Sequence, residues 1–289
     1  MKFVYFFILL CLFSCSSETG INKATANEDL GNFVDDWTFE FFMISSEKNV
    51  FRLWVPENIK PKAILVLAPG NASDGTSLVN RKYWQEYAEK EELAILGIYV
   101  RSDMEGSAFR LLKAIEIISE KNNLEGFTNL PFLLRGFSHG GIFSYVFSEL
   151  YSERVLAFAN IKGSFSDVEK KLPPGLFIIG ENDKIARNES IKNAFLSQRK
   201  KKSISCFIEE PIVGHDVGKS DDLVKVFFET ILEKRLINNE IVDLNEEDFY
   251  LGDNLSSIVY PYSDYINDKS EASCILDLDF AASWKNFKK

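Results

Sequence analysis

Histidine and cysteine are scarce in this sequence. Its 289 residues include two His, which stand far apart, and four Cys, of which Cys206 and Cys274 lie beyond residue 15. A zinc site needs Cys and His ligands at short, regular spacings, so no metal site is indicated. Cys206 lies inside the apolar run 204–208, which favours a buried thiol over a disulfide.

Basic residues are also in short supply. Lys and Arg number 33 against 43 Asp and Glu, which gives a net charge of −10 at pH 7. Such a surface disfavours nucleic acid and anionic lipid headgroups as partners. No repeat, low-complexity block or Pro/Gly-rich linker divides residues 33–289. We therefore expect one globular domain there, of ordinary composition.

The N-terminal segment differs from the rest of the chain. Lys2 is followed by an apolar run at residues 3–13. This run suits a signal peptide and is too short for a bilayer, because a spanning helix needs about 20 apolar residues. Residues 12–15, Leu-Phe-Ser-Cys, resemble the bacterial lipobox, and the resemblance implies cleavage after residue 14 and lipidation of Cys15. The alternative is a plain secretory signal that leaves the protein secreted or periplasmic.

Residues 15–32 are polar and lack hydrophobic periodicity, as expected of a flexible tether between a lipid anchor and a folded domain. Ser16 stands where an Asp often retains lipoproteins in the inner membrane, so we expect anchoring in the outer membrane of the cell envelope. The predicted organisation is a signal peptide at 1–14, a lipidated tether at 15–32 and a folded domain at 33–289. The last part of that domain, residues 237–289, forms a C-terminal extension.

The domain begins with a predicted antiparallel hairpin and continues with strands that alternate with helices. Uninterrupted apolar runs are typical of strands covered on both faces of a parallel sheet. We expect strands at residues 37–44, 50–55, 63–68, 93–100, 131–137, 155–161, 176–180 and 203–209. We expect helices at residues 81–91, 108–118, 140–150, 188–201 and 221–236. The prediction is therefore an α/β protein with an eight-stranded, mostly parallel, doubly wound sheet.

Two regions outside this alternation carry predictions of their own. The segment 162–175 joins two predicted strands and is too short for a large helical cap, so we expect an open site above the sheet. In the C-terminal extension, residues 255–260 favour a strand that Pro261 ends, and residues 280–287 favour a short helix. Three aromatic residues of the extension are most simply packing anchors: Tyr260, Tyr262 and Trp284.

The turn Gly136-Phe137-Ser138-His139-Gly140 has the spacing of a nucleophile elbow. A serine hydroxyl is a weak nucleophile and needs an adjacent base and a sharp, exposed position. Gly-x-Ser-x-Gly supplies that position, because its glycines remove Cβ atoms where strand, turn and helix crowd together. An apolar strand precedes the motif and a helical pattern follows it. Ser138 is therefore the predicted nucleophile.

The general base is predicted from the small number of histidines. His139 is the neighbour of the nucleophile, and its ring is poorly placed to reach the Ser138 hydroxyl. His215 is the remaining histidine, and it follows the last predicted strand of the sheet. We therefore predict His215 as the general base, while the backbone N–H of His139 is expected to donate to the oxyanion.

The third member of a triad accepts the His Nδ1–H and stabilises the imidazolium. Asp183 follows the strand 176–180 and gives the chain order Ser, acid, His. Asp167, after the preceding strand, is the alternative acid. Asp216 is better explained as a loop residue, because a carboxylate next in sequence to the base rarely reaches back to it.

With these residues placed, residues 37–236 resemble the α/β-hydrolase family. The resemblance implies acyl transfer to water through a covalent acyl-enzyme, without metal or organic cofactor. It also implies a second oxyanion donor from the turn after the strand 63–68. Pro69 there replaces the His of the family's His-Gly-x turn, and Gly70 permits close backbone approach. The N–H of Asn71 is the predicted donor, with Ala72 as the alternative.

The sequence is compatible with three functions. The first is a lipid-anchored esterase, a serine carboxylic ester hydrolase acting on a small-molecule ester or an acylated glycan. The second is a peptidase similar to the prolyl oligopeptidase group, although no propeller domain is present in the sequence. The third is a non-catalytic envelope protein that keeps the fold for binding.

Overall fold

The computed structural model describes residues 33–34, 38–42, 48–71, 73–99, 103–166 and 168–289. The predicted signal peptide, Cys15 and the tether lie outside the described residues. So do two alternatives from the sequence, the acid Asp167 and the oxyanion donor Ala72.

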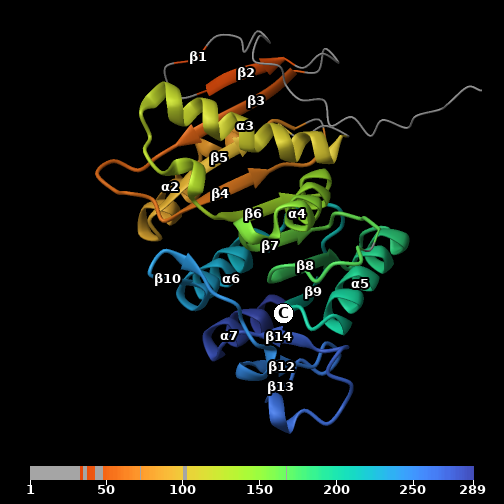
Figure 1. Ribbon diagram of the computed structural model, residues 1–289. Helices are drawn as coiled ribbons and strands as arrows, with labels where there is room; N and C mark the ends of the chain where they lie inside the picture. Colours follow the sequence, from red (N-terminus) through yellow and green to blue (C-terminus); the bar gives the residue numbers. More distant parts are fainter. Residues whose placement is uncertain (1–32, 35–37, 43–47, 72, 100–102, 167) are drawn as a thin grey trace, which may run out of the picture.

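The described chain is built around a nine-stranded sheet (Figure 1) with the order β1-β2-β3-β5-β4-β6-β7-β8-β9. The strands are β1 (Phe33–Val34), β2 (Thr38–Phe42), β3 (Lys48–Trp54), β4 (Ala63–Ala68), β5 (Leu93–Ile98), β6 (Phe132–Phe137), β7 (Val155–Ile161), β8 (Gly175–Gly180) and β9 (Ser205–Glu210). β3 pairs antiparallel with β2 and β5, and every pair from β5 to β9 is parallel. The predicted doubly wound α/β sheet is confirmed. Its eight predicted strands are β2 to β9, and β1 adds a two-residue ninth strand.

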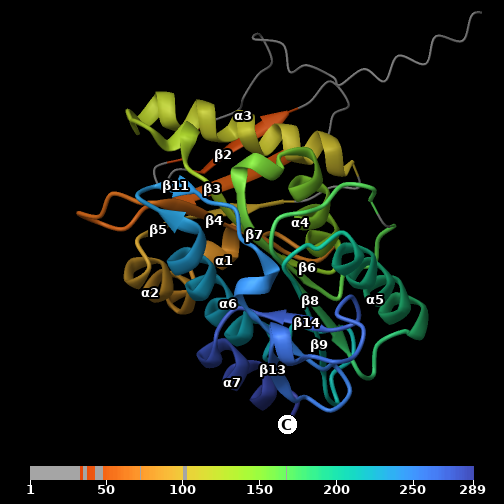
Figure 2. The same ribbon diagram turned by 60° about the horizontal axis from the view of Figure 1, so that its bottom comes forward.

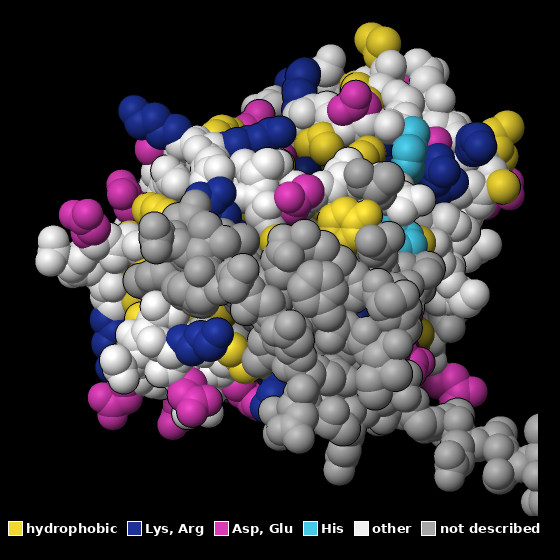
Figure 3. Space-filling model, turned by 90° about the horizontal axis from the view of Figure 1, so that it is seen from above, with side chains coloured by type: hydrophobic (Ala, Val, Ile, Leu, Met, Phe, Trp, Pro, Cys, Tyr) yellow, Lys and Arg dark blue, Asp and Glu magenta, His cyan; other side chains and the backbone are white. Residues whose placement is uncertain are grey.

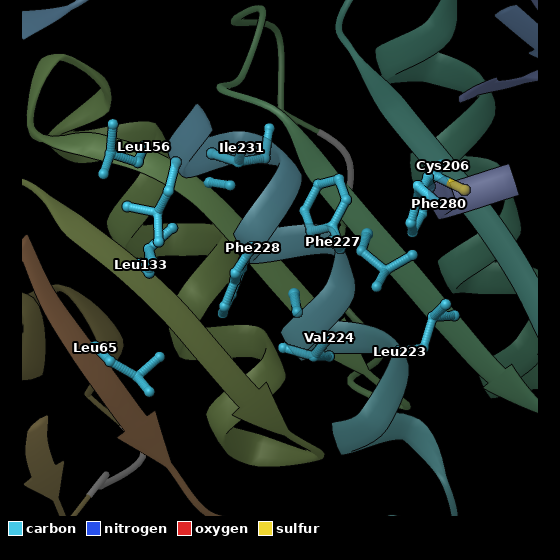
Figure 4. Close-up of a cluster of buried hydrophobic side chains, with 14 of the residues drawn as sticks. Leu65, Leu133, Leu156, Cys206, Leu223, Val224, Phe227, Phe228, Ile231 and Phe280 are labelled. Atoms are coloured by element: carbon cyan, nitrogen blue, oxygen red, sulfur yellow. The ribbon is translucent and has the colours of Figure 1, made fainter. Parts of the chain in front are cut away.

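Helices cover both faces of the sheet. On one face, a hydrophobic cluster joins the strands to α3 (Met104–Asn122), α4 (His139–Leu150) and α5 (Ile185–Lys200). On the other face, a second cluster includes α1 (Thr76–Val79), α2 (Lys82–Lys90), α6 (Ser220–Arg235) and α7 (Leu278–Phe287). Figure 4 shows this second cluster, in which α6 lays its apolar side chains against the sheet. Within the described ranges, no helix combines the length and apolar character needed to cross a bilayer.

Side chains along β4 explain the two clusters. Ile64 and Val66 belong to the first cluster, whereas Leu65 and Leu67 belong to the second. Successive side chains of a strand point to opposite faces, so a continuous apolar run is needed where both faces are covered. The loop from β7 to β8 contains no helix among its described residues. The strands that bear the predicted site therefore end at an edge without a large helical cap.

From residue 250 onward, the C-terminal extension forms a small layer beside β9 (Figure 2). Its strands are β10 (Leu236–Ile237), β11 (Glu240–Ile241), β12 (Tyr250–Gly252), β13 (Val259–Pro261) and β14 (Ser273–Ile275). The last three strands form an antiparallel sheet with the order β13-β12-β14. Over the whole of the described residues, short 3-10 turns lie at Phe127–Asn129, Ser152–Arg154, Glu246–Asp248 and Tyr262–Asp264.

The predicted strand at residues 255–258 is wrong. Those residues form a turn that the Asp253 carboxylate holds, because its Oδ1 accepts the N–H groups of Leu255 and Ser256 at 3.1 and 2.7 Å. Such a local side-chain bond to the backbone competes with strand pairing. The strand β13 begins only at Val259. The prediction placed its start too early because residues 255 and 258 are hydrophobic.

The extension protects the edge strand β9. Ser273 Oγ accepts the Phe207 N–H at 2.8 Å, and Trp284 Nε1 donates to the Phe207 carbonyl at 3.0 Å. An uncovered edge strand exposes unpaired backbone groups to other chains. Cys206 on β9 and Cys274 on β14 are both free and buried, and burial raises the pKa of each thiol to about 12.

We predict that Trp284→Ala lowers the free energy of unfolding by about 3–5 kcal/mol, because it leaves a cavity and removes one of the two hydrogen bonds that the Phe207 carbonyl accepts. Trp284 is 0% exposed, whereas Leu255, in the same extension, is 96% exposed. The control Leu255→Ala should change the free energy of unfolding by less than about 0.5 kcal/mol. Urea unfolding followed by circular dichroism measures both. Equal, small losses would mean that the extension is dispensable for stability.

Candidate active site

Ser138 occupies a strained turn between β6 and α4. Its φ and ψ are 52° and −113°, a backbone conformation that non-glycine residues seldom adopt. The Ser138 N–H donates to the Ile161 carbonyl at 2.7 Å, which ties the turn to the end of β7. The strain lifts the hydroxyl out of the sheet, as the elbow motif predicts.

The two motif glycines are required because the backbones of β4, β6 and α4 come very close together at these positions. A Cβ on Gly136 would lie 2.0 Å from the Gly140 carbonyl oxygen. A Cβ on Gly140 would lie 2.2 Å from the Ala68 carbonyl oxygen. Both separations are far below van der Waals contact, so any larger residue would push the helix α4 away from the sheet. The glycine pattern thus reflects the crossing of β4, β6 and α4.

His215 lies in the loop between β9 and α6 and faces Ser138. Its Nε2 is 2.8 Å from Ser138 Oγ, and its Nδ1 is 2.8 Å from Asp183 Oδ2. With a neutral ring, the serine hydroxyl donates to Nε2 and the Nδ1–H donates to the carboxylate. The Phe137 ring lies 5.2 Å from the imidazole centroid and supports it from one side. The structure therefore brings together the three residues that the sequence selected.

Asp183 follows β8 and is almost fully buried, with its side chain 2% exposed. Its Oδ1 accepts the Lys184 N–H at 2.7 Å and also pairs with the Arg187 guanidinium. Burial raises the pKa of Asp183, but the hydrogen bonds from Lys184 and His215 and the charge of Arg187 outweigh it. The pKa of the carboxyl is therefore lowered, and Asp183 is ionised when it accepts the imidazole N–H.

The turn after β4 lies beside the nucleophile. A Cβ on Gly70 would lie 3.6 Å from the Ser138 Cβ and 3.2 Å from the Phe137 ring. The Pro69 carbonyl accepts the Gly140 N–H at 3.0 Å, which fixes this turn to the start of α4. Asn71 follows and is exposed. The oxyanion roles of the His139 and Asn71 N–H groups stay predictions, placed in a turn and a helix start that adjoin Ser138.

Among the described residues, two members of the triad are partly exposed to solvent. The His215 side chain is 33% exposed, and Ser138 is half-buried. Figure 3 shows histidine side chains at the surface, among hydrophobic and basic side chains. Asp216 turns its carboxylate to the Val217 N–H at 2.6 Å and not to the ring, so it acts as a loop residue. No group of three metal-binding side chains gathers in the described part of the chain.

The comparisons with known proteins extend this picture at the level of the fold. No protein-family model and no curated protein matches the sequence. Solved structures do match, and one is the fluorophosphonate-binding serine hydrolase F of Staphylococcus aureus. It is 15% identical, with a TM-score of 0.52, and the match covers 71% of this chain and 99% of that chain.

Two further matches are esterases. One is a hyperthermophilic esterase from the archaeon Pyrobaculum calidifontis, 13% identical with a TM-score of 0.52 over 72% of this chain and 87% of that chain. The other is a thermostable esterase, 17% identical with a TM-score of 0.52 over 70% and 64%. The chain has the α/β-hydrolase fold. In this fold, the site residues follow successive parallel strands, as the sequence predicts.

Three polar residues near the site were missed from the sequence. Arg187 pairs with Asp183 four residues earlier, a helical spacing that signals contact. Lys162 and Glu210 form a buried ion pair behind the His215 loop. Lys162 directly follows one apolar strand, Glu210 ends another, and neither belongs to a motif, so no sequence signal connects them.

We predict that Asp183→Asn removes a stabilising contribution that depends on pH. Because the folded pKa of Asp183 is lowered, this contribution is fully present above the ordinary Asp pKa of 3.8 and is lost as pH falls further. The difference in unfolding free energy between wild type and variant should therefore shrink between pH 4 and the lowest pH at which the protein folds. Urea unfolding at several pH values measures it. The exposed control Asp248→Asn should show no comparable trend, and a growing difference at acid pH would contradict the prediction.

Proposed function

We propose that this protein is a serine esterase that hydrolyses carboxylic esters through a covalent acyl-enzyme. The observation that carries the proposal is the unbroken hydrogen-bond chain from Ser138 Oγ through His215 to Asp183, with both distances at 2.8 Å. This chain starts on a strained turn at the surface, where a substrate carbonyl has access. The fold shared with esterases supports the proposal as an analogy.

Acylation begins when Ser138 Oγ attacks the ester carbonyl carbon and His215 Nε2 takes the hydroxyl proton. The tetrahedral oxyanion is stabilised by the N–H groups of His139 and Asn71. The bond to the alcohol oxygen then breaks, and the imidazolium returns its proton to the leaving alcohol. The product of this half-reaction is an ester between the acyl group and Ser138.

Deacylation repeats the sequence with water as nucleophile. His215 removes a proton from the water, the hydroxide attacks the acyl-enzyme carbonyl, and the proton passes to Ser138 Oγ as the acid leaves. Asp183 stays ionised throughout, because its hydrogen bonds and Arg187 lower its pKa. Its charge stabilises the imidazolium in both half-reactions and holds the ring so that Nε2 faces the serine.

The substrate is proposed to be a large ester, such as an acylated glycan. The short loop between β7 and β8 and the exposed His215 support this choice, because an uncapped site admits a polymer. A lipid on Cys15 would hold the enzyme on the outer membrane, where envelope and environmental polysaccharides are accessible. The peptidase and the non-catalytic binding protein remain alternatives that experiment separates.

Ser138→Ala is predicted to abolish labelling by a fluorophosphonate probe and to lower kcat for p-nitrophenyl acetate by at least about 10³-fold. The reason is that, in the part of the chain that the structure describes, Ser138 supplies the hydroxyl that contacts His215 Nε2. The exposed control Ser263→Ala should label and turn over like wild type. A folded wild-type protein that neither labels nor cleaves esters would favour the binding alternative.

A substrate panel then separates the enzyme classes. Acetylated and feruloylated glycans, short p-nitrophenyl esters and prolyl peptides are compared by kcat/KM on the same preparation. If the protein is an esterase, we expect turnover of the esters. Turnover of prolyl peptides without ester cleavage would replace the esterase with the peptidase.

We predict that Cys15 carries the lipid anchor. Expressed in a bacterium with labelled palmitate, the wild-type protein should incorporate label and fractionate with membranes. Cys15→Ser should lose both properties, whereas the neighbouring control Cys11→Ser should keep them, because only the residue after the cleavage site is acylated. Membrane association of Cys15→Ser equal to that of wild type would contradict the lipid anchor.

A further inference from the structure

A buried ion pair lies directly beneath the loop that carries His215. Lys162 follows β7 and Glu210 ends β9, and their side chains are 0% and 2% exposed. Lys162 Nζ is 2.6 Å from Glu210 Oε2. Neither residue contacts Ser138, His215 or Asp183 through its charged group. The mechanism proposed above therefore leaves this pair without a role.

Both charged groups also bind the backbone that follows His215. Lys162 Nζ donates to the Asp216 carbonyl. Glu210 accepts the Lys219 N–H on Oε1 and the Ser220 hydroxyl on Oε2, the latter at 3.1 Å. The pair thus holds the loop at three points, beginning with the residue next to the histidine and ending at the start of α6.

Two glycines pack closely against the charged pair. A Cβ on Gly218, whose φ is +55°, would lie 2.1 Å from Glu210 Oε1. A Cβ on Gly180 would lie 2.8 Å from Lys162 Cε and 2.5 Å from the Gly214 carbonyl oxygen. After His215, the chain therefore packs directly against Glu210 at Gly218, whereas before His215 it packs against Gly180, which in turn lies against Lys162.

The same pair is also tied to the nucleophile. Lys162 has a φ of 56°, which turns its side chain under the loop directly after β7. The carbonyl of the preceding residue, Ile161, accepts the Ser138 N–H at 2.7 Å. A Cβ on Gly163 would lie 2.5 Å from the Ser138 carbonyl oxygen. Lys162 thus sits between the serine turn and the histidine loop.

Burying two charges costs several kcal/mol, and apolar residues of similar volume often stabilise a fold better. We propose that Lys162 and Glu210 are positioning residues that hold the 211–219 loop so that His215 reaches both Ser138 and Asp183. This inference rests on the proposed function, because the reaction needs that geometry. A displacement of about 1 Å at a reacting group lowers rates by about 10²-fold.

The test combines Glu210→Gln, Lys162→Met and the double variant Lys162→Met/Glu210→Gln. Each single variant leaves one buried charge unpaired and should be less stable than wild type. The double variant removes both charges and should recover stability. Its kcat for p-nitrophenyl acetate should nevertheless stay at least tenfold below wild type, with KM changed less than threefold, because the loop has lost the Lys162 bond to the Asp216 carbonyl and the charged acceptor at Glu210.

Glu246→Gln is the matched control. Arg199 and Glu246 form a second buried ion pair, 0% and 7% exposed and 2.9 Å apart, between α5 and the C-terminal extension. Breaking it should lower stability as the single variants do but leave kcat unchanged. A double Lys162→Met/Glu210→Gln variant with wild-type kcat would overturn the inference, because the pair would then serve stability alone.

A spectroscopic measurement separates this inference from the proposed function. The chain has only two His, so the ring resonances of His215 are assignable by comparison with His139→Gln. The Nδ1–H proton that is hydrogen-bonded to Asp183 should resonate far downfield in wild type and shift or vanish in the double variant. An unchanged resonance would overturn the inference even if the protein is an esterase. A changed resonance in a protein without ester turnover would support loop positioning while the proposed function failed.

Discussion

The parallel alignment of the central strands is the constraint on which the rest of the site depends. Parallel strands end at the same edge of a sheet, so residues that follow neighbouring strands meet there. The residues that do so here follow β6, β7, β8 and β9 in turn: Ser138, Lys162, Asp183 and His215. This alignment brings close together groups that are up to 77 residues apart in the sequence. The continuous apolar runs that keep these strands buried are therefore also what assembles the site.

The site is held in a costly arrangement by hydrogen bonds from the surrounding strands. Ser138 has a left-handed backbone, and its N–H is fixed by the end of β7. Asp183 carries its charge in a buried position because Lys184 and Arg187 donate to it. Lys162 is likewise buried beneath the histidine loop, where its Nζ donates to the Glu210 carboxylate and to the Asp216 carbonyl. Backbone strain and buried charge persist only where several neighbouring contacts stabilise them.

Much of the fold could be predicted because it depends on local pattern. Eight strands and six helices, the short α7 among them, followed from apolar runs and helical spacing, with ends that differ by a few residues. One error arose where side-chain hydrogen bonds changed the local structure, because Asp253 holds residues 255–258 in a turn and not in a strand. The two-residue strand β1 was missed because it is too short to show a period.

The sequence by itself determined which residues the site contains: a serine on a glycine-framed turn, one eligible histidine, and an acid in the matching chain order. Motif, scarcity and order are properties of the chain and need no coordinates. Only the tertiary structure decided how those groups are held. The partner of Lys162 lies 48 residues away and the partner of Arg199 lies 47 residues away. Which charges meet depends on which strands and helices become neighbours, and that is a property of the packed fold alone.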